Sequence, residues 1–207
     1  MSLFKLRWRY ALSLLLLGLV ASSIGWYVWN QERHYRNFLA VKEGVLYRSG
    51  QLSPKGLERV IYEHNIGTVV SLRGNTQGKQ NHSVEWEEKL CFKNFVHHVA
   101  LPLGSTEQRA QESPGDSFKL VDNAAQLFLD IMSDPVTYPR PILVHCLAGK
   151  HRTGMMCALF RIEKQGWTKE QAIAEMKALG YDDFTGYDPV RDYVVNWAGR
   201  SPSPSTR

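Results

Sequence analysis

The sequence predicts an α/β fold in which a central parallel or mixed sheet is flanked by helices and preceded by one N-terminal transmembrane helix. Two observations predict the α/β part: the runs at 66–72 and 141–144 have the apolar and β-branched composition of buried strands, and stretches of helical periodicity alternate with them. Such alternation is typical of a sheet covered by helices. A third observation, the absence of charge between residues 11 and 29, predicts the membrane helix.

The chain begins with a basic segment at 1–10, followed by the uncharged segment 11–29, which contains four consecutive leucines and has aromatic residues at its ends. As a helix, this segment is long enough to cross a bilayer core of about 30 Å, and we expect a single-pass anchor. The basic residues ahead of it favour a cytoplasmic N-terminus. The alternative is a signal peptide whose cleavage releases an exported soluble protein.

We expect residues 30–43 to be a juxtamembrane linker, residues 44–198 to form one domain, and the serine- and proline-rich residues 199–207 to be a disordered tail. Strand and helix signals follow one another through the domain. They predict a helix with Ser53 as its N-cap and Pro54 as its first residue. The other predicted elements are strands at 45–47, 66–72, 95–101 and 141–144, a helix at 117–133, and helices after 153, 168 and 188.

The most informative stretch is His-Cys-Leu-Ala-Gly-Lys-His-Arg-Thr-Gly at 145–154, between the strand at 141–144 and a helical pattern. Residues 146–152 are called the cysteine loop below. Unpaired N–H groups and the helix dipole make the start of a helix an anion site. Lys150, His151 and Arg152 add positive charge there, and nearby cations lower the pKa of a thiol. Cys146 is therefore predicted to be a nucleophile.

Arg152 can donate two parallel hydrogen bonds to a tetrahedral oxyanion, and Thr153 can offer its hydroxyl to the neighbouring sulfur. Two simpler interpretations exist. Cys146 could be a small buried apolar residue, and the basic helix start could be only a solvated turn.

The Cys-(any five)-Arg spacing, preceded by His145 and followed by Thr153-Gly154, resembles the signature of cysteine-dependent protein tyrosine and dual-specificity phosphatases. Within that superfamily the loop is most similar to atypical dual-specificity phosphatases of plants, fungi and bacteria, some of which act on inositol polyphosphates. A phosphoinositide phosphatase variant also carries Ala-Gly-Lys at the positions of residues 148–150.

The resemblance implies a phosphatase that works through a phosphocysteine on Cys146 and needs no cofactor or metal. It implies that His145 orients the loop and that Thr153 stabilises the leaving thiolate. The phosphate-binding residues it implies are Leu147, Ala148, Gly149, Lys150, His151 and Arg152.

The superfamily takes its general acid, an aspartic acid, from a movable loop ahead of the cysteine. Asp116 stands at the corresponding distance from Cys146, with Glu107 and Glu112 in the same loop. We expect Asp116 to be the acid. The alternative is that Asp116 only occupies the first turn of the next helix.

Two arginines are further candidates for the phosphate pocket. Bacterial relatives often carry a Tyr-Arg-Ser-Gly-Gln stretch and a Leu-Arg pair, which resemble residues 47–51 and 72–73. Arg48 and Arg73 are therefore expected to support the site. An exposed or salt-bridged role is the alternative for each.

The remaining reactive residue types have structural interpretations. His97 and His98 lie on opposite faces of a strand without ligands at metal-binding spacing, so no metal site is expected. Cys91 and Cys157 are interpreted as buried thiols, because three cysteines provide no disulfide framework.

The predicted function is hydrolysis of phosphate monoesters on phosphotyrosine, phosphoserine or phosphothreonine proteins, at a membrane reached through the N-terminal helix. The alternatives are an inositol polyphosphate or phosphoinositide phosphatase, and an inactive phosphate-binding module. The Cys-to-Arg spacing and the absence of a second cysteine from the cysteine loop disfavour a sulfur-transfer or thiol-redox enzyme. A nucleic-acid partner is not expected, because the net charge of +5 is spread along the chain.

Overall fold

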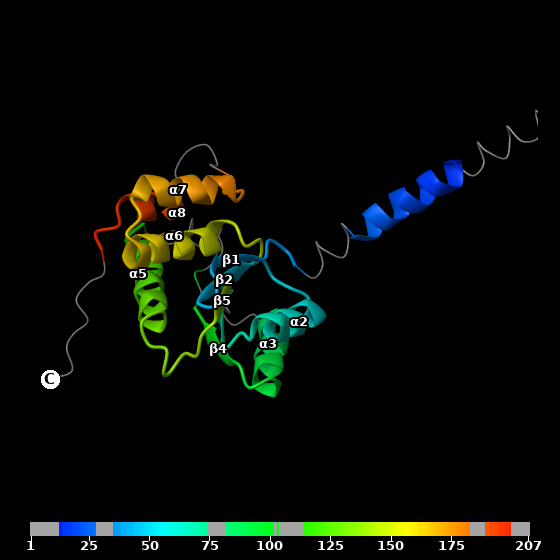
Figure 1. The fold of residues 1–207 in the computed structure, drawn as a ribbon. Coiled ribbons are helices and arrows are strands. Elements are labelled where there is room, and N and C mark those ends of the chain that lie inside the picture. Colours follow the sequence, from blue (N-terminus) through cyan, green and yellow to red (C-terminus); the bar gives the residue numbers. More distant parts are fainter. Residues whose placement is uncertain are drawn as a thin grey trace, which may run out of the picture.

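The computed structural model describes residues 13–27, 35–73, 82–101, 103, 114–182 and 189–199. It contains a five-stranded sheet in the order β1-β2-β5-β3-β4 (Figure 1). The strands are β1 (Leu39–Lys42), β2 (Leu46–Ser49), β3 (Thr68–Ser71), β4 (His97–Ala100) and β5 (Ile142–His145). The helices are α2 (Pro54–His64), α3 (His82–Lys93), α5 (Pro114–Ile131), α6 (His151–Gln165), α7 (Lys169–Ala178) and α8 (Pro189–Val195).

The sheet is mixed, which is one of the two arrangements predicted. β5 lies at its centre and pairs in parallel with β2 and β3, β3 pairs in parallel with β4, and only β1 is antiparallel to its neighbour β2. The register aligns His145 with Ser49 on one side and with Ser71 on the other. Because parallel strands end at the same edge, the residues that follow these three positions share one edge of the sheet, where α/β proteins place their ligands.

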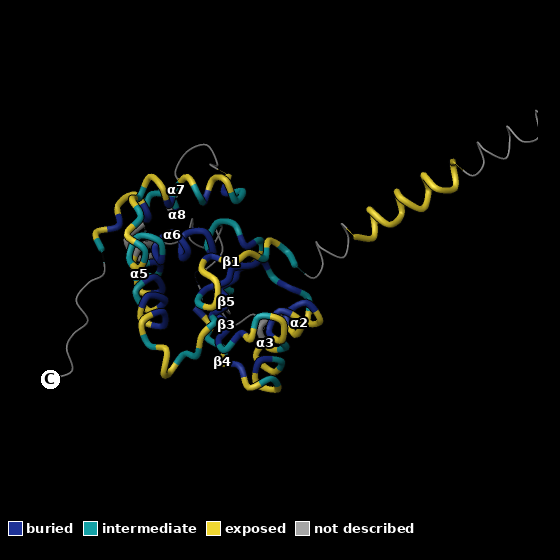
Figure 2. Tube along the Cα trace, viewed as in Figure 1, coloured by how far each residue is buried: buried dark blue, intermediate teal, exposed yellow. Residues whose placement is uncertain are grey.

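Helices cover both faces of the sheet, and alternation along the strands separates two cores (Figure 2). Ile142 and Val144 face the larger core with residues of α5, α6, α7 and α8, whereas Leu143 faces the smaller core with residues of α2 and α3. All four residues of β2, β3 and β5 are buried, as expected for strands covered on both faces.

Local sequence signals account for several helix ends. The Ser53 side chain accepts from Gly56 N–H at the start of α2, as predicted, and Thr168 and Gln171 form a capping box at the start of α7. Gly166 ends α6 in the left-handed conformation, with φ of 68°.

The prediction that residues 30–43 are only a linker is corrected at its C-terminal part. Residues Leu39–Lys42 form β1, so the sheet begins before residue 44. The strand is four residues long and mostly exposed, with a register shift opposite β2. A short edge strand of this kind has no alternating apolar pattern by which a sequence would identify it.

The structure does not support the predicted transmembrane helix at 11–29 or the single-pass localisation. Residues 13–27 are helical with exposed side chains. Among the described residues no helix is long and apolar enough to span a membrane. Residues 1–12 and 28–34, and most of the predicted tail, lie outside the described residues.

Truncation of the central strand should destabilise the fold. Leu143 is fully buried, so Leu143→Ala should lower the free energy of unfolding by roughly 2–5 kcal/mol in urea denaturation. The matched variant Leu39→Ala removes the same atoms from a residue that is 43% exposed on edge strand β1, and should cost less than about 1 kcal/mol. Equal losses in the two variants would contradict the central position of β5.

Candidate active site

The cysteine loop joins the end of β5 to the start of α6. Lys150 is the N-cap of α6, and its side chain makes no capping hydrogen bond. The first N–H groups of this helix therefore keep their capacity to bind an anion. The loop begins at the carboxyl edge of the central strand, which is the edge that the strand register points to.

Cys146 is buried, with 3% of its surface exposed, yet its surroundings favour the thiolate. Burial raises the pKa of the thiol, but the Thr153 hydroxyl and N–H, the Arg152 charge and the Gly149 N–H together lower it below its ordinary value. Gly149 N–H donates to Cys146 Sγ at 3.2 Å. Thr153 is fully buried, and its hydroxyl is the largest of the influences that lower the pKa of the Cys146 thiol.

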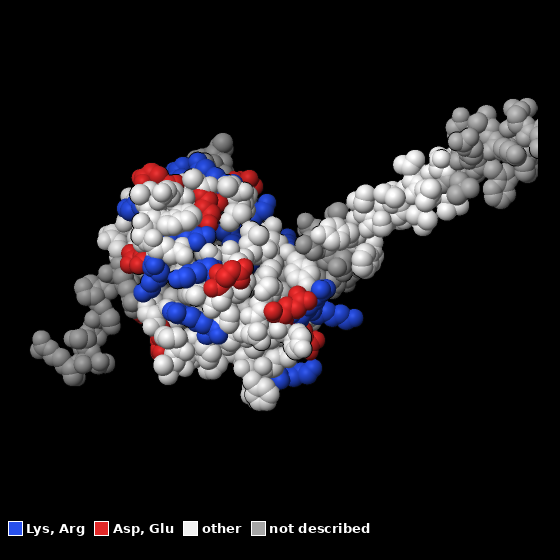
Figure 3. Space-filling model, viewed as in Figure 1, with Lys and Arg blue, Asp and Glu red and all other residues white. Residues whose placement is uncertain are grey.

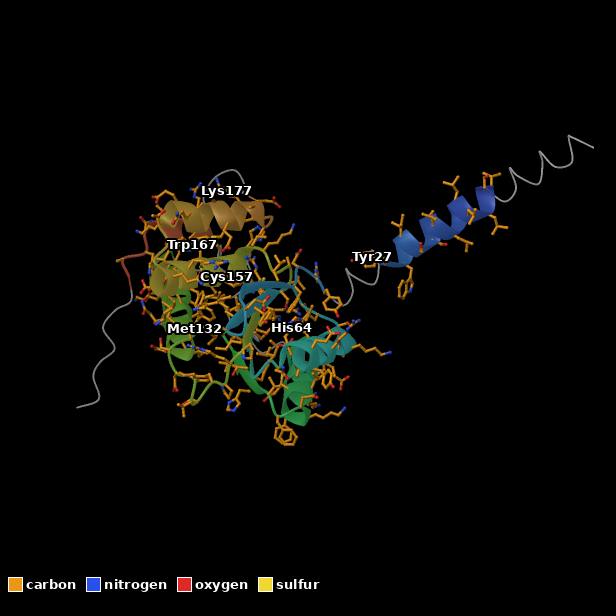
Figure 4. The ribbon with its side chains drawn as sticks, in the orientation of Figure 1. Tyr27, His64, Met132, Cys157, Trp167 and Lys177 are labelled. Atoms are coloured by element: carbon orange, nitrogen blue, oxygen red, sulfur yellow. The ribbon has the colours of Figure 1, made fainter. Side chains whose placement is uncertain are left out.

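The pKa values of the other two thiols are shifted in the opposite direction. Burial raises the pKa of Cys91 to about 12 and the pKa of Cys157 to about 11. All three cysteines are free, and Cys157 lies within α6 (Figure 4). Cys146 is therefore the thiol whose surroundings suit a nucleophile, and its catalytic role stays a prediction.

Gly149 allows the tight loop path. Its φ is 75°, which non-glycine residues rarely adopt, and a Cβ atom there would lie 2.4 Å from Gly50 N and 2.6 Å from Ser49 O. The backbone of residues 49–50, just after β2, is thus packed directly against the cysteine loop.

Arg48 supports the loop from β2 through the loop backbone. Its side chain is buried, with the residue 2% exposed, and Nη2 donates to Gly149 O at 2.6 Å. Arg152 is held in turn by the end of β3, since its Nη1 donates to Leu72 O at 3.0 Å. Arg48 and Arg152 therefore both donate hydrogen bonds to backbone carbonyls.

Arg73 follows Leu72 and adds positive charge at the same edge of the sheet. Burial lowers its pKa, and the nearby positive charges of Arg152 and Arg36 act in the same direction, while Glu87 opposes them. Arg73 Nη1 donates to Gln51 Oε1 at 2.7 Å. The Cys146 thiolate is among the charges that Arg73 interacts with.

Glu87, on α3, connects these residues to the central strand and was missed by the sequence reasoning. Its Oε1 lies 2.9 Å from His145 Nε2 and 3.0 Å from His98 Nε2, and its Oε2 accepts from Gln51 Nε2 at 2.7 Å. Burial raises the pKa of this carboxyl, but His145, His98 and Gln51 lower it well below its ordinary value. The ring of His145 is therefore held by a hydrogen bond to the buried carboxylate of Glu87.

A sequence signal for Glu87 existed. It precedes Leu90 and Cys91 by three and four residues, which puts a carboxylate on the apolar face of α3. Acidic residues are seldom fully buried without partners, so such a position indicates a polar network.

Asp116 lies in the first turn of α5, the position that the alternative interpretation gave it. Its side chain lies outside the described residues, as do Glu107 and Glu112. The general acid therefore stays a prediction.

Lys150 and His151 lie beside the segment that follows α7. A Cβ atom on Gly180 would lie 3.2 Å from Lys150 Nζ, and the His151 ring meets the Tyr181 ring edge-on at 5.3 Å. Leu147, by contrast, is about half exposed. On the face shown in Figure 3, the coloured basic and acidic side chains are interspersed.

Comparison with known proteins agrees with this geometry. A model of a tyrosine phosphatase family matches residues 32–163. The dual specificity protein phosphatase TpbA of Pseudomonas aeruginosa is 44% identical over 52 residues, which is 25% of this chain and 22% of that protein. The match thus spans about a fifth of the relative's length.

Two solved structures share the fold. The P. aeruginosa TpbA crystal structure has a TM-score of 0.54 at 22% identity, covering 78% of this chain and 84% of that one. The catalytic core of the PP-IP phosphatase Siw14 from S. cerevisiae has a TM-score of 0.57 at 18% identity, covering 78% and 85%.

Replacing Glu87 should weaken the fold in a pH-dependent way. Because the pKa of Glu87 is lowered in the folded protein, its stabilisation is complete above the unfolded value of 4.5 and is lost as pH falls below it. Glu87→Gln should lower the free energy of unfolding by roughly 1–3 kcal/mol at pH 7. The difference from the wild type should be about 1.4 kcal/mol smaller at pH 3.5.

Urea denaturation at both pH values checks this, with the exposed neighbour Glu88→Gln as the matched control. A difference for Glu87→Gln that stays constant between the two pH values would contradict a lowered pKa of Glu87 in the folded protein.

Proposed function

The chain belongs to the tyrosine phosphatase family and is a cysteine-dependent phosphatase, and from this premise we propose that it removes phosphate from phosphotyrosine, phosphoserine or phosphothreonine in proteins. The observation that supports the proposal most is the thiol of Cys146, whose pKa is lowered despite its burial. A thiolate at the start of a helix, with Arg152 beside it, combines a nucleophile with an oxyanion site.

In the proposed reaction, the Cys146 thiolate attacks phosphorus in line with the ester oxygen. The S–P bond forms as the P–O bond breaks, and the departing oxygen takes a proton from Asp116. Arg152 and the loop N–H groups hold the charge on the three remaining phosphoryl oxygens.

The second step returns the enzyme to its starting state. A water molecule gives its proton to the Asp116 carboxylate and attacks phosphorus, so that the S–P bond breaks and inorganic phosphate leaves. The electron pair returns to sulfur, where the Thr153 hydroxyl and the Gly149 N–H stabilise the thiolate.

A second substrate class, inositol polyphosphates or phosphoinositides, is supported by the surplus of positive charge. Arg73 interacts with the charges of Cys146, Arg152 and Arg36, and Lys150 lies in the loop itself. One phosphoryl group requires only Arg152 and the N–H groups, so the additional cations suit a substrate with several phosphates. Phosphate release from matched phosphopeptides and inositol polyphosphates distinguishes the two classes.

Cys146→Ser should abolish turnover of an aryl phosphate, and Arg152→Lys should lower kcat/KM by roughly 10²–10³-fold, because lysine cannot reproduce the paired donors. Arg59→Lys, an exposed exchange on α2, is the control and should leave kcat/KM unchanged. If the wild type releases no phosphate from the aryl phosphate, the phosphopeptides or the inositol polyphosphates, the chain is instead an inactive phosphate-binding module.

Asp116→Asn should lower kcat by roughly 10²–10⁴-fold for a phosphoserine peptide, whose leaving oxygen needs a proton. The loss should be much smaller for an aryl phosphate with a weakly basic leaving group. The variants Glu107→Gln and Glu112→Gln serve as controls from the same segment. A larger leaving-group-dependent loss in either control would transfer the acid role to that residue.

A further inference from the structure

Three consecutive carbonyls of the cysteine loop are held by donors from the segment 37–51. Gln51 N–H donates to Leu147 O at 3.0 Å, Asn37 Nδ2 donates to Ala148 O at 2.7 Å, and Arg48 Nη2 donates to Gly149 O at 2.6 Å. None of these donors belongs to the loop, and Asn37 precedes β1 in a part of the chain where the sequence predicted only a linker.

Holding a carbonyl also orients the N–H group that follows it. In a trans peptide the C=O of one residue and the N–H of the next point in opposite directions. The donors from segment 37–51 therefore turn the N–H groups of residues 148, 149 and 150 away from that segment. The middle peptide shows the result directly, because its Gly149 N–H donates to Cys146 Sγ at 3.2 Å.

Asn37 is thus separated from the reactive sulfur by one peptide unit. Its amide donates to Ala148 O, and the N–H on the other side of the same peptide donates to the sulfur. A hydrogen bond accepted by the carbonyl polarises the peptide and strengthens donation by its N–H group.

The neighbours of Asn37 fix its position. The Phe38 ring stacks on Tyr47 of β2 at 5.6 Å and lies 4.8 Å from the His64 ring of α2. On the other side of Asn37, Arg36 O accepts from Gly50 N–H at 2.7 Å. Asn37 itself has φ of 49°, a left-handed conformation that asparagine and glycine tolerate better than other residues.

We propose that Asn37 is a positioning residue of the active site, which acts through the Ala148–Gly149 peptide to aim the Gly149 N–H at the Cys146 sulfur. The inference rests on the proposed function of the cysteine loop. It assigns the 35–38 turn a role in the reaction, although no atom of Asn37 is required to touch the substrate.

Asn37→Gly in the full-length protein tests this role, because glycine keeps the left-handed backbone and removes only the side-chain amide. The matched control is Asn65→Gly, which makes the same exchange at φ of 50° in the C-cap of α2. Iodoacetamide alkylation of Cys146, followed by mass spectrometry across pH, measures the thiol pKa without any substrate. Turnover of an aryl phosphate is measured in parallel.

Asn37→Gly should raise the pH midpoint of Cys146 alkylation by about half to one pH unit, and lower kcat/KM by roughly 3- to 10-fold. Asn65→Gly should change neither. An unchanged alkylation midpoint in Asn37→Gly would overturn the proposal even if turnover fell, since a purely structural role predicts that result. An equal rise in the midpoint with Asn65→Gly would also overturn it.

The two readouts separate this inference from the proposed function. If the wild type releases no phosphate, the proposed function fails, whereas the alkylation midpoints of the two variants still decide the role of Asn37.

Discussion

The active site depends on the stabilisation of a negative charge on a buried sulfur. Burial alone would keep the Cys146 thiol protonated, as it does for Cys91 and Cys157. The fold offsets this cost with donors that it brings to one point from the loop and from the first turn of α6. Two of these donors are the backbone N–H groups of Gly149 and Thr153, so the conformation of the loop matters as well as its residue types.

The sheet order makes that conformation possible. β5 is central, so the cysteine loop leaves it with β2 on one side and β3 on the other. The ends of both neighbours contribute contacts: Arg48 and the backbone of residues 49–51 come from the side of β2, and Leu72 O holds Arg152 from the side of β3. Behind the loop, Glu87 on α3 holds His145. The site thus combines segments that are far apart in the chain.

The difference between local patterns and contacts over long stretches of chain explains what the sequence could predict. Local patterns, namely a seven-residue spacing, an apolar run and helical periodicity, indicate the candidate nucleophile, its arginine, the following helix and a sheet covered by helices. The contacts of Asn37, Arg48 and Glu87 with the loop or with His145 join residues 58 to 111 positions apart, and no local pattern specifies such pairings. β1 was missed because a short, exposed edge strand lacks alternation. The uncharged N-terminal run predicted a membrane helix from composition alone, which the described residues do not support.

The central claim is that the fold makes Cys146 a thiolate despite its burial. It is tested most directly on the wild-type protein. Residue-resolved alkylation by iodoacetamide, followed by mass spectrometry as a function of pH, gives the apparent pKa of each thiol. The account predicts a midpoint for Cys146 clearly below the free-cysteine value of about 8.5, with Cys91 and Cys157 unreactive until far higher pH. A Cys146 midpoint at or above that value would contradict it.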